Sequence, residues 1–138
     1  MKAMRSALGS LSVAQETLDE MPGPAPGTTA IAATEPGMGG WAGCSALGAR
    51  GKPAEQVGRE AAQAFTRFLA SRAALDLHLA DQLLLYAALA EGTTALTVEA
   101  ITEHTRTNLW VIGQFLGPRF AVTEAAGEPP IITARSSE

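Results

Sequence analysis

Cysteine is nearly absent from this sequence, because Cys44 is the only one among 138 residues. A single thiol cannot close a disulfide within the chain, so a disulfide framework of a small secreted domain is excluded and a reducing, cytoplasmic location is expected. Lysine and arginine number 10 against 14 acidic residues, giving a net charge of −4. The sequence has no basic block, so composition alone gives no sign of nucleic-acid binding.

Long apolar runs are also lacking. The longest, from Leu83 to Ala90, is far shorter than the roughly 20 residues that cross a bilayer, so no membrane contact is expected. No apolar run follows Lys2 and Arg5, so no signal peptide is expected. The chain does contain 46% hydrophobic residues, enough for the core of one domain of ordinary size.

A domain boundary is predicted near the start of the chain. Residues 3–20 carry apolar side chains at helical spacing and predict an amphipathic helix. Residues 22–27, Pro-Gly-Pro-Ala-Pro-Gly, cannot continue it and predict a linker. We therefore assign residues 1–21 to the end of an inserted or upstream domain and residues 28–138 to a C-terminal domain.

The C-terminal domain is predicted to alternate between strands and helices. Strands are expected at residues 28–34, 41–47, 93–98, 120–124 and 130–134, and helices at 53–71, 76–90 and from 103. Helices on one side of a mixed β-sheet, an α+β fold, satisfy this order. Arg50 and Lys52 lie in a glycine-containing loop that could meet a phosphate, although a solvated turn is favoured.

The stretch 101–109 predicts a helix start with a histidine in its first turn. Thr102 can cap the helix, and the helix dipole disfavours the imidazolium form of His104, which favours a neutral, nucleophilic ring. Free N–H groups at the same end could hold a phosphate. Asn108, one turn on, could bind and orient the ring. On these residues alone, a surface histidine beside a cap is the favoured alternative.

A second polar group is expected at the start of the helix at 76–90, which Asp76 can cap. His78, Asp81 and Gln82 share one face there, above Leu85 in the following turn. This arrangement suits a planar, hydrogen-bonding ligand such as a nucleobase, and an exposed first turn is the alternative. One histidine and one carboxylate are too few ligands for a metal.

Three separated stretches resemble the C-terminal part of RNA 3′-terminal phosphate cyclases. They are residues 45–53 (Ser-Ala-Leu-Gly-Ala-Arg-Gly-Lys-Pro), 78–84 (His-Leu-Ala-Asp-Gln-Leu-Leu) and 104–108 (His-Thr-Arg-Thr-Asn). The likeness extends from about residue 28 to about residue 134 and implies the cyclase / EPSP-synthase-like repeat fold. Residues 28–138 would then be the C-terminal catalytic domain.

The resemblance implies an ATP-dependent ligase that converts an RNA 3′-phosphate into a 2′,3′-cyclic phosphate through a histidyl-AMP intermediate. It places the nucleophile at His104, with Asn108 as a candidate for orienting the ring. The ATP contacts it implies are His78, Leu79, Ala80, Asp81 and Gln82.

Family members are more than twice as long as this chain. A divalent metal, expected to be Mg, and part of the RNA contact would be held by the missing N-terminal part, so we assign no metal ligand here. The chain is expected to be weak or inactive alone. The alternatives are a non-catalytic cyclase-like factor in RNA processing or ribosome assembly, and an inactive fragment. That factor does not keep the histidine, so His104 favours the enzyme.

Overall fold

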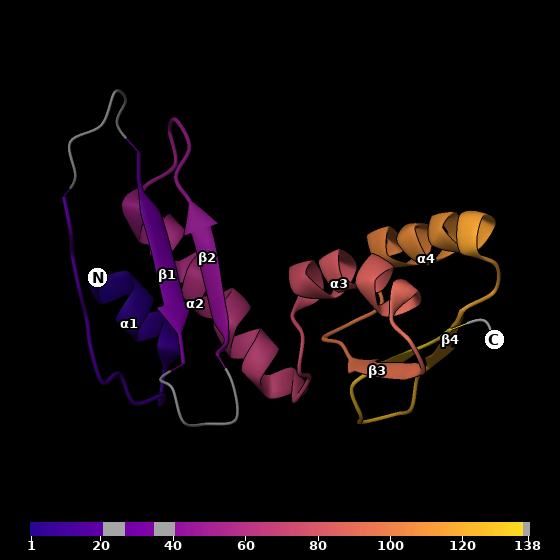
Figure 1. The fold of residues 1–138 in the computed structure, drawn as a ribbon. Coiled ribbons are helices and arrows are strands. Elements are labelled where there is room, and N and C mark those ends of the chain that lie inside the picture. Colours follow the sequence, from indigo (N-terminus) through magenta and orange to yellow (C-terminus); the bar gives the residue numbers. More distant parts are fainter. Residues whose placement is uncertain (21–26, 35–40, 137–138) are drawn as a thin grey trace. The chain divides into compact units, whose positions relative to one another are not determined.

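The computed structural model describes residues 1–20, 27–34 and 41–136. The chain divides into two compact units, residues 1–67 and 68–138, and each is described by itself (Figure 1). The predicted turn at 36–40 and, except for Gly27, the predicted linker at 22–27 lie outside the described residues.

The first unit contains a short helix, a β-hairpin and most of a long helix. These are α1 (Lys2–Leu8), β1 (Thr29–Ala33), β2 (Gly43–Leu47) and α2 (Ala54–Ser71), which continues into the second unit. The strands pair antiparallel, from Thr29 opposite Leu47 to Ala33 opposite Gly43, so the predicted hairpin is confirmed.

The predicted helix over residues 3–20 is too long, because α1 ends at Leu8. Gly9 follows with a φ of 62°, a left-handed conformation that glycine adopts without steric cost and that stops a helix. α1 has no buried residue, so little packing favours a longer helix. It lies close to α2 at Gly58, where an added Cβ would be 3.1 Å from the Cβ of Met4.

The second unit contains two helices and a three-stranded sheet. The elements are α3 (Leu77–Leu89), β3 (Thr93–Thr97), α4 (Glu103–Leu116), β4 (Phe120–Thr123) and β5 (Ile131–Arg135). The sheet has the antiparallel order β3-β5-β4. The two helices lie over the same face of this sheet (Figure 1). The α+β fold with helices on one side is therefore confirmed.

The strand pairing differs from the single mixed sheet that the sequence predicted. The strands of the described segments form two sheets, and every ladder between them is antiparallel. Parallel pairing in those segments is limited to a bridge between Leu75 and Val98. This bridge joins the residue before the Asp76 cap to the residue after β3, and it fixes where α3 begins.

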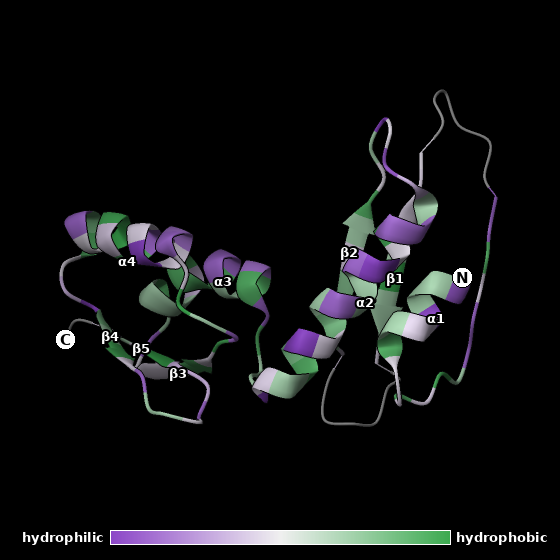
Figure 2. Ribbon diagram, turned by 180° about the vertical axis from the view of Figure 1, so that it is seen from behind, coloured by the Kyte–Doolittle hydropathy of each residue, from purple (hydrophilic) through white to green (hydrophobic). Residues whose placement is uncertain are grey.

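The core of the second unit lies between the helices and the sheet. Ala80 and Leu84 of α3 meet Val98 and Ile132 there, and all four are fully buried. Hydrophilic and hydrophobic residues alternate along α4 in Figure 2, as expected for a helix with one face on the core. No helix in the described ranges is long and apolar enough to cross a membrane.

Replacing Leu84 by alanine tests this core. The change removes a side chain with no exposed surface, so the free energy of unfolding should fall by about 2–5 kcal/mol. Its neighbour Leu85 is 48% exposed, and Leu85→Ala should cost less than about 1 kcal/mol. Urea unfolding followed through the amide signals of β5 measures both. Equal losses in the two variants would contradict this core.

Candidate active site at the N-terminal ends of two helices

A side-chain cap fixes the first turn of α3. The carboxylate oxygen Oδ1 of Asp76 accepts hydrogen bonds from the backbone N–H groups of His78, at 2.9 Å, and Leu79, at 2.7 Å. Both donors lack partners within a helix, which is why aspartate is favoured at this position. The cap therefore holds the backbone that carries His78 and Asp81, and the predicted helix start is confirmed.

The first turn of α4 is fixed in the same way. The hydroxyl of Thr102 accepts a hydrogen bond of 3.0 Å from the backbone N–H of Thr105. Glu103 is the first residue of the helix and His104 the second, so His104 stands where backbone N–H groups point out of the helix end. This end carries a partial positive charge that attracts anions.

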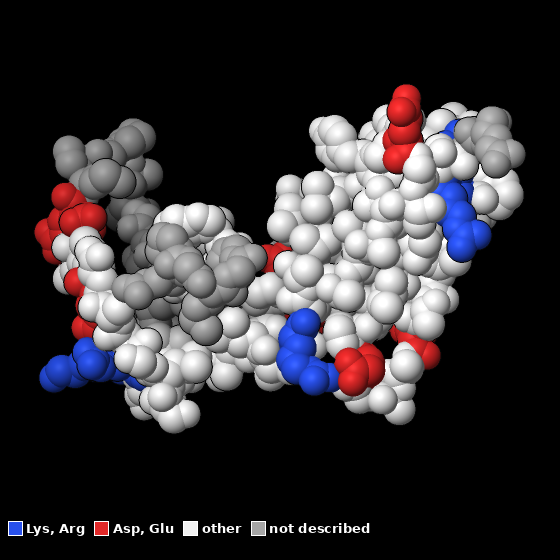
Figure 3. All heavy atoms as spheres, turned by 60° about the horizontal axis from the view of Figure 1, so that its bottom comes forward, with Lys and Arg blue, Asp and Glu red and all other residues white. Residues whose placement is uncertain are grey.

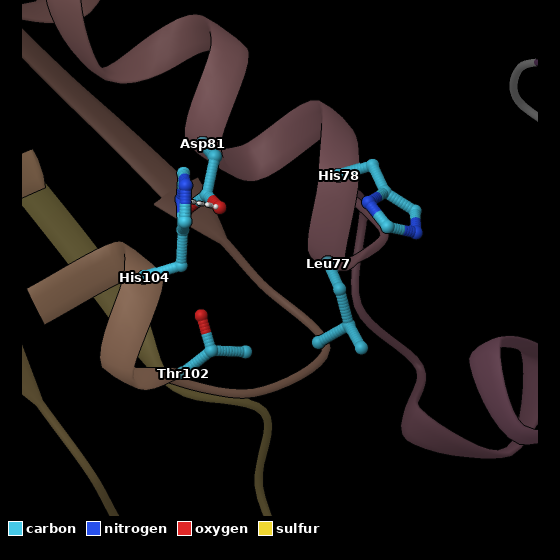
Figure 4. Close-up of a pocket in the computed structure, with 5 residues that line it drawn as sticks. All are labelled: Leu77, His78, Asp81, Thr102 and His104. Atoms are coloured by element: carbon cyan, nitrogen blue, oxygen red, sulfur yellow. Dashed lines mark hydrogen bonds and ion pairs between the residues drawn. The ribbon is translucent and has the colours of Figure 1, made fainter.

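Asp81 connects the two helices. Its oxygen Oδ2 lies 2.7 Å from Nδ1 of His104, and its oxygen Oδ1 accepts a hydrogen bond of 2.8 Å from the hydroxyl of Thr105. Figure 4 shows the His104 ring and the Asp81 carboxylate facing one another. The side chain of Asp81 is 17% exposed, whereas that of His104 is 76% exposed. A largely buried carboxylate thus holds a largely exposed imidazole.

The contacts of Nδ1 decide which ring nitrogen is free. Asn108 Nδ2 lies 3.2 Å from the same Nδ1 of His104, but one nitrogen cannot both donate to Asp81 and accept from an amide. The carboxylate is nearer and accepts only, so Nδ1 carries the hydrogen. With Nδ1 protonated, a hydrogen bond at this contact requires the opposite amide assignment for Asn108, with its carbonyl oxygen toward the ring. The lone pair of the neutral ring is left on Nε2.

A cavity of about 330 Å³ opens beside this pair. Its lining residues, drawn in Figure 4, are Leu77, His78, Asp81, Thr102 and His104. All five come from the first five residues of α3, the first two residues of α4 or the residue that caps α4. The cavity therefore lies beside an imidazole and a helix N-terminus, and the helix N-terminus attracts phosphate groups.

Comparison with known proteins decides the family. A family model for RNA 3′-terminal phosphate cyclase matches residues 4–122. The chain belongs to this family. It is 42% identical over 133 residues to an RNA 3′-terminal phosphate cyclase from Pyrobaculum neutrophilum, covering 95% of this chain. Cyclases from Methanosarcina mazei and Thermococcus onnurineus are 50% and 53% identical over 88 and 87 residues, which are 64% and 63% of this chain.

The chain spans only part of these relatives. Its match covers 38% of the length of the Pyrobaculum cyclase and 25% of the length of the other two. The sequence resemblance to the cyclase family is thus confirmed, and it holds for one portion of the family's length.

Only some of the residues expected to contact ATP line the cavity in the structure. His78 and Asp81 line the cavity. Ala80 is fully buried in the core beneath them. Leu79 is 42% exposed and Gln82 is exposed, and neither lines the cavity. The structure therefore places two of the five expected residues beside His104.

Two functional candidates were missed by sequence reasoning. Leu77 lines the cavity as the first residue of α3. Thr105 is buried and contacts Asp81, although it stands between two exposed residues in the sequence. Its place at the third position after a threonine cap was the available signal, because this position faces back toward the capping residue.

The glycine-containing loop in the first unit of this cyclase chain has a structural explanation. The Lys52 ammonium donates to the Leu47 carbonyl oxygen at 3.1 Å and forms an ion pair with Glu60. The hydrogen bond from Lys52 lowers the pKa of the Glu60 carboxyl, and a second bond from Gln56 adds to this effect. With Lys52 held in these contacts, the loop fits the favoured interpretation of a turn.

Charged residues form no metal-binding cluster in the part of the chain that the structure describes. Within residues 1–20, 27–34 and 41–136, no three His, Cys, Asp or Glu residues stand close enough to hold a metal ion. Figure 3 shows blue Lys or Arg side chains at its lower centre directly beside red Asp or Glu side chains. The cavity beside His104 therefore remains the best-defined candidate site.

Removing the α3 cap tests how the site is positioned. Asp76→Ala deletes both hydrogen bonds to the first turn, so the free energy of unfolding should fall by about 1 kcal/mol. The backbone amide signals of His78 and Leu79 should shift toward those of a frayed turn. Asp76→Asn is the matched control, because its side-chain oxygen caps equally well. Equal changes in both variants would show that the cap does not position this turn.

Proposed function

We propose that this chain supplies the nucleophile of an ATP-dependent RNA 3′-phosphate cyclase, and that the nucleophile is Nε2 of His104. One observation carries the proposal. The ring stands at a helix N-terminus with Nδ1 held by Asp81 at 2.7 Å, while 76% of the side chain is exposed beside a cavity. A nucleophile that attacks phosphorus needs both an accessible lone pair and a binding site for the phosphate beside it.

The proposed first step adenylylates the ring. The Nε2 lone pair attacks the α-phosphorus of ATP, an N–P bond forms, and the bond to the oxygen bridging to the β-phosphate breaks, so that pyrophosphate leaves. The imidazole gains positive charge as the bond forms. Asp81 stabilises that charge through the Nδ1–H bond, as the carboxylate does in other oriented histidines. The N–H groups at the start of α4 stabilise charge on the phosphoryl oxygens.

The proposed later steps use the same geometry. An oxygen of the RNA 3′-phosphate attacks the adenylyl phosphorus, the N–P bond breaks, and its electron pair returns to Nε2. The RNA 2′-hydroxyl then attacks the 3′-phosphorus and loses its proton to solvent, and AMP leaves with the electrons of the broken P–O bond. A ring held by Asp81 returns to the Nδ1–H form without reorienting, so it is ready for another ATP.

Other contacts of ATP follow from the cavity walls. We propose that the His78 ring and Leu77 provide a surface for the adenine, since both line the cavity on its α3 side. Asp81 acts through His104, because both of its oxygens already bind side chains of α4. A divalent cation, proposed to be Mg²⁺, would neutralise the pyrophosphate, and its ligands would belong to the rest of the family's length.

A chimera tests the nucleophile. In it, this chain replaces the matching 38% of the Pyrobaculum neutrophilum cyclase, and the protein is incubated with Mg²⁺ and ATP labelled at the α-phosphate. We expect a covalent adduct that acid cleaves and base does not, because the bond is a P–N bond. His104→Ala should abolish it.

The matched control for this experiment is His78→Ala. It removes the other histidine of the same cavity and should keep the label at saturating ATP. Label that persists in His104→Ala, or that is lost equally in both variants, would refute the assignment. An unlabelled chimera that still binds RNA would favour the non-catalytic alternative.

A second variant tests the role of Asp81. Asp81→Asn keeps the shape of the side chain but places an amide where two donors point, so the ring no longer has a fixed Nδ1–H form. The rate of adduct formation in the chimera should fall by at least about tenfold, with ATP affinity nearly unchanged. A rate equal to that of the parent chimera, in a folded variant, would refute this role.

A further inference from the structure

Thr105 is the one buried polar side chain among the residues that the structure describes. Its relative exposure is zero, although it lies between the exposed residues His104 and Arg106. Its hydroxyl oxygen lies 2.8 Å from Oδ1 of Asp81 and 2.9 Å from the hydroxyl oxygen of Thr102. A buried hydroxyl with two such partners is held in place by its surroundings.

Counting hydrogens gives these bonds a direction. An ionised carboxylate carries no hydrogen, so the Thr105 hydroxyl must donate to Asp81. A hydroxyl has only one hydrogen, so the Thr105 oxygen accepts from Thr102. The Thr102 oxygen accepts in turn from the backbone N–H of Thr105 at 3.0 Å. The bonds therefore run one way, from the helix backbone through two hydroxyls to the carboxylate.

The other carboxylate oxygen extends this series of hydrogen bonds to the ring. Oδ2 of Asp81 lies 2.7 Å from Nδ1 of His104. If Oδ1 were not held, the carboxylate could rotate about its terminal torsion, which is broad for aspartate. The exposed ring has little packing of its own, so its hydrogen bonds decide both its orientation and its tautomer. The orientation of the ring thus depends on a group that does not touch it.

We infer that Thr105 is a positioning residue for the nucleophile. Its buried hydroxyl orients the Asp81 carboxylate, and through it selects the Nδ1–H form of His104 that leaves Nε2 free. The relevance to adenylylation rests on the proposed function. The selection of a tautomer is a property of this chain alone and is measurable without ATP.

The test uses the 138-residue chain with ¹⁵N-labelled histidine. The chain has two histidines, so His78 serves as an internal reference for His104. Ring ¹⁵N shifts, recorded at alkaline pH where imidazole is neutral, report which nitrogen carries the hydrogen. The parent chain should show His104 mainly in the Nδ1–H form. In Thr105→Val, which keeps the shape and removes the hydroxyl, that preference should be lost and the Nε2–H form should dominate.

Two variants separate positioning from a general loss of structure. Thr105→Ser restores a hydroxyl and should restore the Nδ1–H form. Thr107→Val removes a hydroxyl from the same helix, one that bonds the Glu103 carbonyl oxygen at 2.8 Å, and should leave the His104 shifts unchanged. A folded Thr105→Val chain that keeps the parent tautomer would overturn the inference.

A measurement on the unaltered chain guards against a variant that fails to fold. The Thr105 hydroxyl proton should exchange slowly with water and show a dipolar contact to the Asp81 side chain. Exchange as fast as that of an exposed threonine would overturn the inference. If the tautomer depends on Thr105 but the chimera forms no adduct, the proposed function fails and the positioning role stands. If the adduct forms through His104 but the tautomer is the same with and without the Thr105 hydroxyl, the positioning role fails and the proposed function stands.

Discussion

The contact on which the site depends is the carboxylate of Asp81, shared between the ring of His104 and the hydroxyl of Thr105. It joins two helices near their N-terminal ends. It also determines which nitrogen of an exposed ring has a free lone pair. Without it, His104 would be an ordinary solvent-exposed histidine near a helix end. A phosphate at that end would then meet no oriented ring.

This contact is possible because the core below it is fixed. Ala80, next to Asp81 in the chain, is fully buried beside Leu84, and both pack on the sheet with Val98 and Ile132. Apolar packing sets the position of α3, and the cap at its start sets the path of the first turn. Asp81 then reaches His104 and Thr105 by adopting one suitable rotamer. The second unit by itself thus holds the proposed nucleophile together with Asp81 and Thr105, although the chain spans a minor part of its relatives' length.

Local signals in the sequence were sufficient for most of the second unit. Asp76 and Thr102 each predicted a helix start, since a cap acts within three residues, and the structure confirms both. The extent of α1 was not predictable, because apolar spacing specifies a helix only where a partner buries it. Packing of that kind is absent from α1, in which no residue is buried.

The site was predictable in its parts and not in its assembly. The four-residue spacing of Asn108 from His104 predicted that the two side chains lie together, and Nδ2 of Asn108 lies 3.2 Å from Nδ1 of His104. The closer partner, Asp81, comes from another helix 23 residues away, and no short-range pattern specifies how α3 and α4 dock. The same docking buries Thr105, so its role could not be read from neighbours that are both exposed.

The residue that follows α2 has an unusual backbone. Arg72 has a φ of 58° and is the one residue other than glycine with a positive φ among those described. That conformation costs about 1–2 kcal/mol in a residue with a Cβ. Its guanidinium bonds Glu128 at 2.9 Å and the Gly127 carbonyl oxygen at 3.1 Å, in the loop between β4 and β5. Both charged side chains are largely exposed, so dissolved salt weakens their attraction. Raising the ionic strength therefore weakens one of the contacts that hold the link between α2 and α3, while the hydrogen bonds of Ala74 and Leu75 to β3 remain.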